Sequence, residues 1–412
     1  MADTFRCRSC GAPVSHGFVD LGETPLANSY VRPENLGKPE ARFPLRAAVC
    51  GSCFLVQLDH NVPAEHIFDS EYAYFSSYSE SWLAHAKRYS EHVIPRFGLG
   101  PQSLVMEVAS NDGYLLRNFV EAGIPVLGIE PTSNTAEAAE KVGVRTRVCF
   151  FHTETGRQLA AEGLQADLIA ANNVMAHVPD LADFVGGFAH ALKPEGVLTV
   201  EFPHLLNLIE QVQFDTIYHE HYSYLSLLSV EAALGRVGIR VFDVQQLPTH
   251  GGSLRVFACR EGASHAATEG LALVRRLEAE AGFATLDAYT RFGERAAACR
   301  EGFRRFLAEA KAEGKVIAAY GAAAKGNTFL NYCGTTADDI AYVVDRNPHK
   351  QGRYLPGSLL PILGPEHIAE TKPDYLVILP WNLRDEIMGQ MANIREWGGR
   401  FVTAVPEIRV FD

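Results

Sequence analysis

Residues 104–116 read Leu-Val-Met-Glu-Val-Ala-Ser-Asn-Asp-Gly-Tyr-Leu-Leu. The pattern is that of a short apolar strand, a turn of small and polar residues, and the first turn of a helix. A second apolar strand at 126–129 ends in an acid, Glu130. This order is typical of a parallel βαβ unit that binds a nucleoside, because an acid at the tip of the second strand can accept hydrogen bonds from both ribose hydroxyls.

The turn favours S-adenosylmethionine over a dinucleotide. A dinucleotide turn places pyrophosphate on a helix N-terminus and needs several glycines, whereas this turn has only Gly113. A carboxylate in the turn would repel pyrophosphate but suits a cationic, phosphate-free cofactor. The predicted cofactor contacts from this unit are Glu107, Ala109, Asn111, Gly113, Tyr114, Glu130 and Pro131.

Strands and helices continue to alternate after this unit, which predicts an α/β fold with a doubly wound parallel sheet. Further strands are expected at 144–148, 168–171 and 197–202, and a hairpin at 241–246 and 253–260 would close the sheet. Ligands of such sheets bind beyond the carboxyl ends of the strands. Asn172 and Asn173 follow one of these strands, so we add them to the predicted cofactor site.

A second α/β unit begins after a helical bridge at 264–312. Residues 316–330 again read as strand, small-residue turn and helix, and further strands are expected at 340–344, ending in Asp345, and at 375–379. The turn carries Lys325, and exposed amides with a cation suit the phosphates of a nucleoside diphosphate. A turn used only for close packing is the alternative.

Two Cys-x-x-Cys knuckles, Cys7–Cys10 and Cys50–Cys53, predict a structural metal site. Four thiolates fill the tetrahedral coordination of Zn²⁺ and leave no open position for catalysis. Four reduced buried cysteines, or a redox pair, are the alternatives; neither explains the pairing as well.

Composition narrows the class of protein. The chain has 412 residues, which suggests two or three domains, and it is 47% hydrophobic, which favours a globular protein. Its net charge of −12 is a poor match for a nucleic-acid backbone. The first residues hold no apolar signal segment, and no run reaches the roughly 18 apolar residues of a membrane span. We therefore expect a cytoplasmic protein with no nucleic-acid or membrane partner.

Residues 214–224 crowd proton-transfer groups directly after the strand at 197–202. Within this segment Tyr218, His219, Glu220, His221 and Tyr222 are consecutive. A His-x-His pair could bind metal, but no third ligand stands at a fixed spacing. A histidine that takes a proton, a carboxylate that orients it and a tyrosine that donates to an oxyanion form a better interpretation. A methyltransferase that needs a base is suited to the methylation of a carbon atom, since removing a proton beside a ketone makes that carbon a nucleophile.

The order of these motifs resembles the zinc-containing, S-adenosylmethionine-dependent sugar C-methyltransferases of deoxysugar biosynthesis. The resemblance rests on both knuckles, the Glu-x-Ala-Ser-Asn-Asp-Gly-Tyr-Leu-Leu loop, Tyr-His-Glu-His-Tyr-Ser-Tyr at 218–224, Gly-Gly-Ser-Leu-Arg at 251–255 and Tyr-Gly-Ala-Ala-Ala-Lys-Gly-Asn at 320–327. It implies C-methylation of a dTDP-linked 4-keto-6-deoxysugar, most often at C-3′, for antibiotic biosynthesis. The Ala-Ser pair replaces a glycine common in methyltransferase loops, so individual cofactor contacts can differ.

The resemblance also implies three domains: a zinc-binding domain at 1–70, a class I methyltransferase domain at 71–262 and a second Rossmann-like domain at 263–412 that helps hold the nucleotide sugar. The implied catalytic residues are His221, as the likeliest base, with Tyr218, Glu220 and, across the cleft, His177; whether His177 or His221 is the base stays open. The implied substrate contacts are Tyr74, Tyr78, Tyr222, Lys325 and Asn327, although the tyrosines near 71–82 could equally pack at a domain seam. We expect a monomer.

Three rival interpretations remain. An NAD-dependent nucleotide-sugar oxidoreductase would use 315–330 as its dinucleotide turn and Asp345 as its ribose acid, but that turn lacks the glycine spacing for pyrophosphate. A zinc-ribbon binding protein without activity would not need two ligand-type sheets. A nucleic-acid methyltransferase is disfavoured by the charge of −12.

Overall fold

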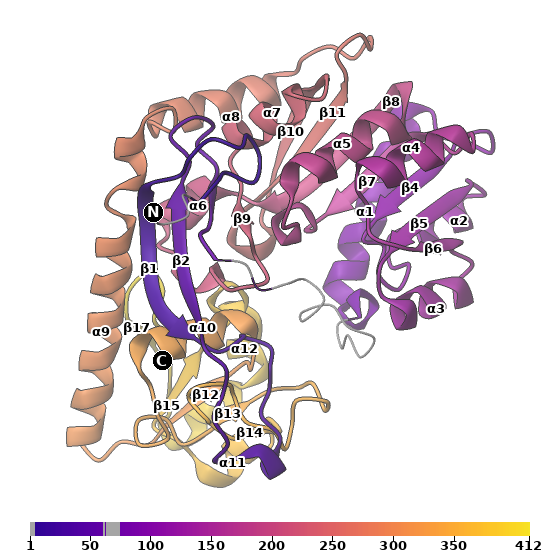
Figure 1. The fold of residues 1–412 in the computed structure, drawn as a ribbon. Helices are drawn as coiled ribbons and strands as arrows, with labels where there is room; N and C mark the ends of the chain where they lie inside the picture. Colours follow the sequence, from indigo (N-terminus) through magenta and orange to yellow (C-terminus); the bar gives the residue numbers. More distant parts are fainter. Residues whose placement is uncertain (1–4, 61, 63–74) are drawn as a thin grey trace.

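Three β-sheets form the framework of the protein (Figure 1). The computed structural model describes residues 5–60, 62 and 75–412. The elements confirm the predicted α/β class, with a cysteine-bearing module, a central Rossmann-like domain and a further C-terminal domain with a parallel sheet.

The N-terminal sheet has four antiparallel strands in the order β1-β2-β3-β9. Three come from the cysteine module, and the fourth comes from the proton-transfer segment near residue 220. The strands are β1 (His16–Thr24), β2 (Phe43–Val49), β3 (Val56–Leu58) and β9 (Ser223–Tyr224). Pairing of β9 with β3 therefore joins the knuckle module to the predicted catalytic segment.

The central sheet has seven strands in the order β10-β11-β8-β7-β4-β5-β6. The five strands β4 to β8 are parallel, and the hairpin β10–β11 closes one edge antiparallel, as predicted. The strands are β4 (Val105–Val108), β5 (Val126–Glu130), β6 (Thr146–Val148), β7 (Ala166–Asn172), β8 (Leu192–Pro203), β10 (Ile239–Leu247) and β11 (Ser253–Arg260).

Helices cover both faces of this sheet. One face packs on α1 (Glu80–Phe97), α2 (Arg117–Glu121) and α3 (Ser133–Lys141), and the other on α4 (Thr153–Ala161), α5 (Leu181–Ala191), α7 (Leu227–Gly235) and α8 (Glu269–Glu280). Buried strands read as continuous apolar runs because both faces are covered. Helix α1 has capping residues at both ends: the Ser79 side chain caps its N-terminus, and Gly98 ends it in the left-handed conformation.

The C-terminal sheet has six strands in the order β14-β13-β12-β15-β16-β17, and only β17 is antiparallel. The strands are β12 (Ile317–Tyr320), β13 (Val343–Val344), β14 (Ile362–Leu363), β15 (Tyr375–Ile378), β16 (Arg400–Thr403) and β17 (Arg409–Phe411). The helices of this domain are α10 (Ala324–Cys333), α11 (His367–Thr371) and α12 (Arg384–Gln390).

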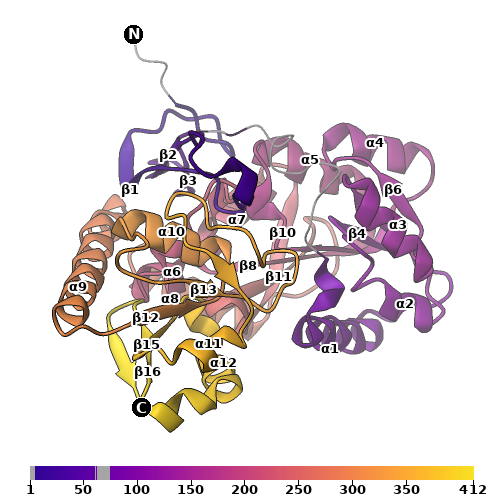
Figure 2. The same ribbon diagram turned by 90° about the horizontal axis from the view of Figure 1, so that it is seen from below.

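The predicted helical bridge consists of two helices with different packing. Helix α8 lies on the central sheet, whereas α9 (Phe292–Ala312) runs along β1 and leads into the C-terminal sheet (Figures 1 and 2). The short helix α6 (Leu205–Glu210) and a 3-10 turn, η5 (Phe214–Thr216), follow β8. In the described part of the chain, no helix combines the length and apolar character needed to span a membrane.

Candidate functional site

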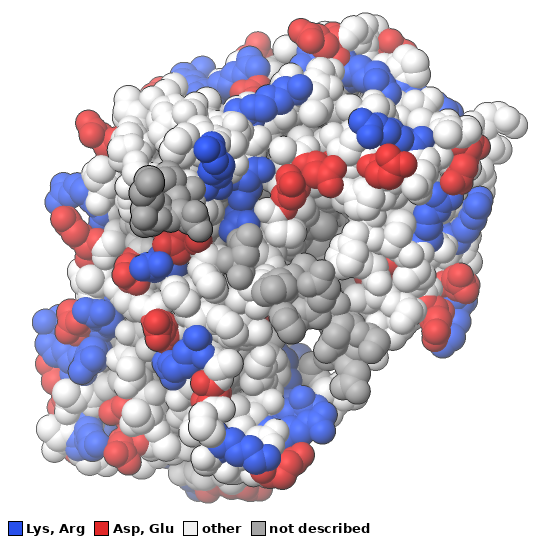
Figure 3. Space-filling model, in the orientation of Figure 1, with Lys and Arg blue, Asp and Glu red and all other residues white. Residues whose placement is uncertain are grey.

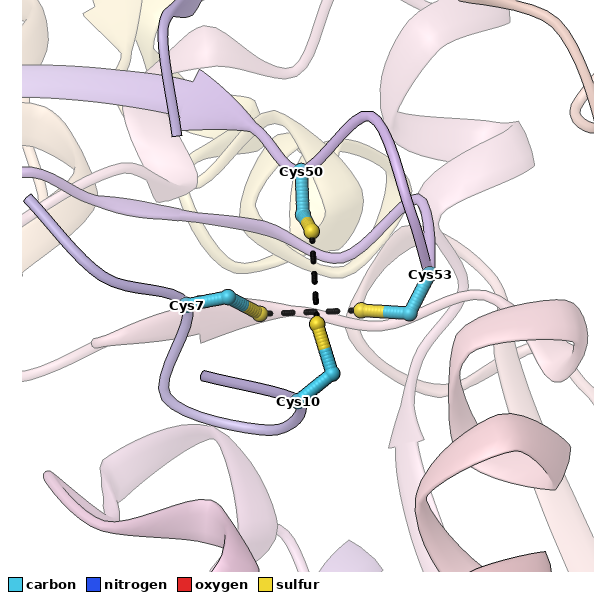
Figure 4. A group of neighbouring side chains, drawn as sticks. All are labelled: Cys7, Cys10, Cys50 and Cys53. Carbon is cyan, nitrogen blue, oxygen red and sulfur yellow. Dashed lines mark hydrogen bonds between the residues drawn. The ribbon is translucent and has the colours of Figure 1, made fainter. Parts of the chain in front are cut away.

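The four knuckle cysteines converge on one point (Figure 4). Their sulfur atoms all lie within 4.8 Å of one another, with Sγ–Sγ distances of 3.6 Å for Cys7–Cys53 and 3.5 Å for Cys10–Cys50. Four sulfurs around a tetrahedral ion at about 2.3 Å would stand roughly 3.8 Å apart, so the cluster needs only a small adjustment to hold one.

Donors around the cysteines also suit thiolates. The Gln57 amide donates to the Cys7 sulfur at 3.2 Å, and the Ser52 backbone N–H donates to the Cys50 sulfur at 3.4 Å. Each knuckle closes through a residue with positive φ, Gly11 in the first and Phe54 in the second. Gly51, inside the second knuckle, does not have a positive φ.

The predicted cofactor loop lies at the carboxyl edge of β4, where its backbone is tightly bent. Ala109, Asn111 and Gly113 all have positive φ. A side chain on Gly113 would stand 3.0 Å from the Val144 side chain, so glycine is required there for space as well as for conformation. The residues before α1 close over the loop, because the backbone N–H of Ser76 donates to the Asn111 side chain at 2.9 Å.

Glu107, at the base of this loop, is fully buried. Within the described chain, neither of its carboxylate oxygens has a hydrogen bond of good geometry. Burial raises its pKa well above the ordinary value, the neighbouring Tyr114 hydroxyl opposes the rise, and Asp112 and Glu130 add to it. Three acids around one loop favour a cationic ligand group.

Glu130 holds the loop in place. One carboxylate oxygen accepts the Asn111 backbone N–H at 2.8 Å, and the other accepts the backbone N–H of Thr132 at 2.9 Å and its hydroxyl. Each carboxylate oxygen can accept more than one hydrogen bond, so Glu130 retains capacity for a ribose hydroxyl. Pro131 is half-buried beside it.

Asn172 and Asn173 lie at the end of β7, next to the loop in the sheet order. Asn173 has positive φ, and its backbone N–H donates to the Glu201 carbonyl at 2.7 Å. The side-chain carbonyl oxygens of both asparagines are buried without a hydrogen bond partner among the described residues. The loop and the two amides thus share one edge of the sheet, as predicted.

His221 is held by a hydrogen bond at each ring nitrogen. Nδ1 lies 2.9 Å from the Thr216 carbonyl oxygen, which can only accept, so Nδ1 carries the proton. Nε2 is then an unprotonated acceptor, and the Tyr218 hydroxyl donates to it at 2.8 Å. Burial lowers the pKa of His221 well below its ordinary value, and the neighbouring His177 ring and Lys325 ammonium lower it further. The imidazole is therefore neutral and has the tautomer of a base.

His177 packs edge-on against His221, with ring centroids 4.6 Å apart. Burial lowers its pKa to about 4. The structure thus brings three of the four predicted catalytic side chains together: His177, Tyr218 and His221.

The other members of the segment face elsewhere. Glu220 accepts a hydrogen bond from the Asn28 amide at 2.6 Å, and burial raises its pKa. His219 is buried against β2, 3.2 Å from the Pro44 carbonyl oxygen. Tyr222 is fully buried, and its hydroxyl donates to the Val62 carbonyl at 2.6 Å. His219 and Tyr222 therefore anchor the segment to the N-terminal module.

Lys325, in the first turn of helix α10, brings a cation from the C-terminal domain to this site. Its ammonium is buried without a hydrogen bond partner among the described residues and lies 5.1 Å from the centre of the Trp381 ring. Burial lowers its pKa, and the carboxylate of Asp215 opposes that shift. Asn327, also buried, accepts a hydrogen bond from the Asn331 amide within α10.

The predicted tyrosine cover is described only in part. Tyr74 lies outside the described residues. Tyr78 is 73% exposed and stacks on Phe75, with ring centroids 5.4 Å apart.

Sequence reasoning missed several residues of the site. Asn28 comes from the cysteine module, Asp215 and Trp381 meet across two domains, and His250 sits in a left-handed turn near Lys325. The spacing of these residues along the chain does not indicate that they meet. Only the position of Trp381, two residues after the end of the predicted strand at 375–379, indicated a place at the edge of a sheet.

Family comparisons cover most of the chain. Residues 7–68 match a family described as "Putative zinc binding domain", residues 82–244 match "Methyltransferase domain", and residues 248–406 match "C-methyltransferase C-terminal domain".

Among curated proteins, the chain is 36% identical to the C-methyltransferase NovU of Streptomyces niveus, over 98% of this chain and 96% of that protein. It is 24% identical to a ubiquinone biosynthesis O-methyltransferase of Rhodopseudomonas palustris, over 34% of this chain and 63% of that protein.

Among solved structures, an S-adenosylmethionine-dependent methyltransferase from Clostridium acetobutylicum aligns with 43% of this chain and 91% of its own at 12% identity and a TM-score of 0.36. A likeness at that level carries no argument about activity.

Proposed function

The chain belongs to the C-methyltransferase family with an N-terminal zinc-binding domain and is an S-adenosylmethionine-dependent C-methyltransferase; we propose that its acceptor is a dTDP-linked 4-keto-6-deoxysugar, methylated at C-3′. The product would serve the biosynthesis of an antibiotic deoxysugar. The observation that carries the proposal is the neutral His221, with its unprotonated Nε2 held by Tyr218 and the Lys325 ammonium close by.

S-adenosylmethionine would be held at the carboxyl edge of the central sheet. Glu107, Asn111 and Gly113 would line its amino-acid end, because a bound ammonium would compensate the buried Glu107 and favour its charged form. Glu130 would accept the ribose hydroxyls, and the free amide oxygens of Asn172 and Asn173 would complete the polar lining. When bound, the cofactor supplies an electrophilic methyl group on a sulfonium.

The ion in the cysteine cluster is proposed to be Zn²⁺ held by Cys7, Cys10, Cys50 and Cys53. The fit rests on four sulfurs within 4.8 Å of one another and on N–H donors aimed at two of them. A site closed by four sulfurs is structural.

The nucleotide sugar would lie between the central and C-terminal domains. Its diphosphate is an anion, and the buried Lys325 ammonium, although the Asp215 carboxylate acts on it, makes no hydrogen bond among the described residues and can donate to a phosphate. Lys325 fits that role and lies close enough to lower the pKa of both His221 and His250.

The proton step follows from the His221–Tyr218 pair. His221 Nε2 takes the proton from the carbon beside the C-4′ ketone, and the electrons of the broken C–H bond form an enolate. Nε2 can take this proton only after the Tyr218 hydroxyl has released it, and that hydroxyl can then donate to the enolate oxygen instead. The carbon of the enolate would then form a bond to the methyl group, and the electron pair of the broken carbon–sulfur bond would stay on sulfur, so that the cofactor leaves as a neutral thioether. His177, neutral and packed on His221, limits the ring's movement.

The test is a mass-spectrometric assay in deuterated water with S-adenosylmethionine and dTDP-4-keto-6-deoxyhexoses, with and without a 3-amino group. We expect a product with one added methyl group and loss of the original proton at the methylated carbon. Without S-adenosylmethionine, deuterium should exchange into the position beside the ketone. If no sugar of this class is methylated or exchanged, the proposed substrate is wrong.

A further inference from the structure

Asp215 and Trp381 join the catalytic segment to the C-terminal domain. Asp215 belongs to η5, is 1% exposed, and accepts a hydrogen bond from the Trp381 indole N–H at 2.7 Å. Trp381 follows β15 in the C-terminal domain. A hydrogen bond to a buried carboxylate is among the stronger ones that a protein makes.

The indole touches several parts of the site at once. Its ring lies over the Lys325 ammonium, and a side chain at Gly251 would stand 2.6 Å from the ring. Gln213, just before η5, donates to the Gly251 carbonyl at 2.9 Å. Trp381, η5 and the turn at 249–251 therefore form one packed unit.

This packed unit includes the residue whose carbonyl group holds His221, the proposed base. Asp215 immediately precedes Thr216, whose carbonyl oxygen fixes the His221 tautomer. The Thr216 hydroxyl in turn donates to the Gln213 carbonyl at 2.8 Å. A movement of η5 would displace the carbonyl that keeps the proton on Nδ1 and leaves Nε2 free to act.

We propose that Asp215 and Trp381 are positioning residues for His221: their hydrogen bond across the domain boundary holds the Thr216 carbonyl in place. The same indole packs against Lys325, the residue that is proposed to bind the anionic substrate. Trp381 therefore links the substrate-binding cation to the base. This inference rests on the proposed function for its kinetic test, but the contacts themselves do not depend on the identity of the sugar.

The test compares W381F, D215A and D215N. W381F keeps an aromatic ring over Lys325 but has no N–H, D215A has no acceptor, and D215N keeps an acceptor for the indole. W397F is the matched control, because the Trp397 indole N–H donates to the Pro373 carbonyl at 3.0 Å inside the C-terminal domain.

We expect W381F and D215A to lower kcat and the rate of deuterium exchange together by about tenfold or more, with KM for the nucleotide sugar and Kd for S-adenosylmethionine changed less than about twofold. D215N should restore both rates to within about threefold of wild type, and W397F should leave them unchanged. Thermal unfolding of each variant shows whether it is folded.

Three results would overturn the inference. They are normal exchange and kcat in folded W381F, a change in KM alone, or a D215N variant as impaired as D215A. The last result would assign the role to the negative charge beside Lys325 and not to the hydrogen bond.

A substrate-independent measurement separates this inference from the proposed function. Nitrogen-15 NMR of labelled histidine, with H221N to assign the His221 resonance, should show the Nδ1–H tautomer in wild type and a loss of that preference in W381F. If wild type neither methylates nor exchanges the sugars, the proposed substrate fails while the NMR comparison still decides the role of Trp381. An unchanged tautomer in W381F would reject the positioning role.

Discussion

At His221, the chemistry depends on which ring nitrogen carries the proton. The Thr216 carbonyl cannot donate, so it places the proton on Nδ1 and leaves Nε2 as the acceptor of the Tyr218 hydroxyl. The neighbouring Glu220 contacts Asn28 instead, so the predicted pairing of a carboxylate with the base is replaced by a backbone carbonyl.

We expect H221N to abolish proton transfer while leaving the cofactor site intact. Asparagine can preserve polar contacts but cannot accept the proton at neutral pH, so kcat and deuterium exchange should fall by at least about 100-fold. Isothermal titration should give a Kd for S-adenosylmethionine within about twofold of wild type, since the proposed cofactor contacts lie on other segments. H190N, on helix α5, is the control. Near-normal turnover would remove His221 from the role of base and leave His177.

The pH dependence of exchange should reflect the lowered pKa of His221. Burial lowers it well below 6.5, the neighbouring His177, Lys325 and His250 add to that shift, and the Thr216 carbonyl opposes it. A base must be unprotonated, so a lowered pKa extends the active range towards acid. The exchange rate should therefore stay level down through pH 6.5 and fall only below it. Circular dichroism at each pH checks that the fold persists. An acid limb centred at 6.5 or above would contradict this account.

At the scale of elements, the cofactor loop and the residues before α1 hold each other. The Asn111 backbone N–H donates to Glu130 at the end of β5, and the Asn111 side chain accepts a hydrogen bond from the backbone N–H of Ser76, just before α1. The sequence predicted the strand, turn and helix of this unit, but not the second layer over the loop. Contacts between residues 35 positions apart have no local pattern.

E130A should weaken S-adenosylmethionine binding by about tenfold or more, because it removes the proposed ribose contact and frees the Asn111 amide. T132V separates these effects. It removes only the hydroxyl that donates to Glu130, so it should change Kd by less than about threefold. Titration calorimetry measures both. If E130A bound the cofactor as wild type does, the proposed ribose contact would be wrong.

The second α/β unit has the predicted strand, turn and helix, and the buried ammonium of Lys325 comes from the first turn of helix α10. Asp345, which the oxidoreductase alternative would use for ribose, accepts the backbone N–H of Ala322 and of Asn347, both at 2.8 Å. No comparison supports that alternative.

At the scale of the whole molecule, the proton-transfer segment lies where three domains meet. It supplies β9 to the N-terminal sheet, follows β8 of the central sheet, and packs through η5 on α10 and Trp381 of the C-terminal domain.

Charges of both signs are interspersed over the face shown in Figure 3. The domain boundaries near 70 and 262, the monomeric state and the absence of a nucleic-acid partner stay predictions.

Removing the cluster metal should inactivate the protein without touching the catalytic residues. A thiolate cluster that loses its ion loses a large stabilising term, and β3, which begins three residues after Cys53, pairs directly with β9. We expect metal analysis to find about one zinc per chain, and C50S or strong chelation to lower Tm by at least about 5 °C and to lower exchange with it.

C149S is the matched control, because Cys149 lies outside the cluster and is half-buried. It should retain the metal, the Tm and the activity. A C50S variant that keeps wild-type Tm and exchange would show that the cluster does not support the catalytic segment.

The sequence alone determined the features that depend on local pattern: the alternation of strands and helices, the caps of α1, the two cysteine knuckles and the small-residue turns. Periodicity, capping and ligand spacing act over a few residues, so they can be read without a fold. The meeting of Tyr218, His177 and His221 was expected only from the position of their segments on the sheet edge.

Only the tertiary structure decided which of the crowded polar groups serves chemistry and which serves packing. His219 and Tyr222 stand beside His221 in the chain, yet they anchor the segment to the N-terminal module. Asp215 and Trp381 are 166 residues apart and meet through packing of two domains. Burial and partners across domains set the tautomer and the pKa of a side chain, and neither is encoded in the spacing of residues along the chain.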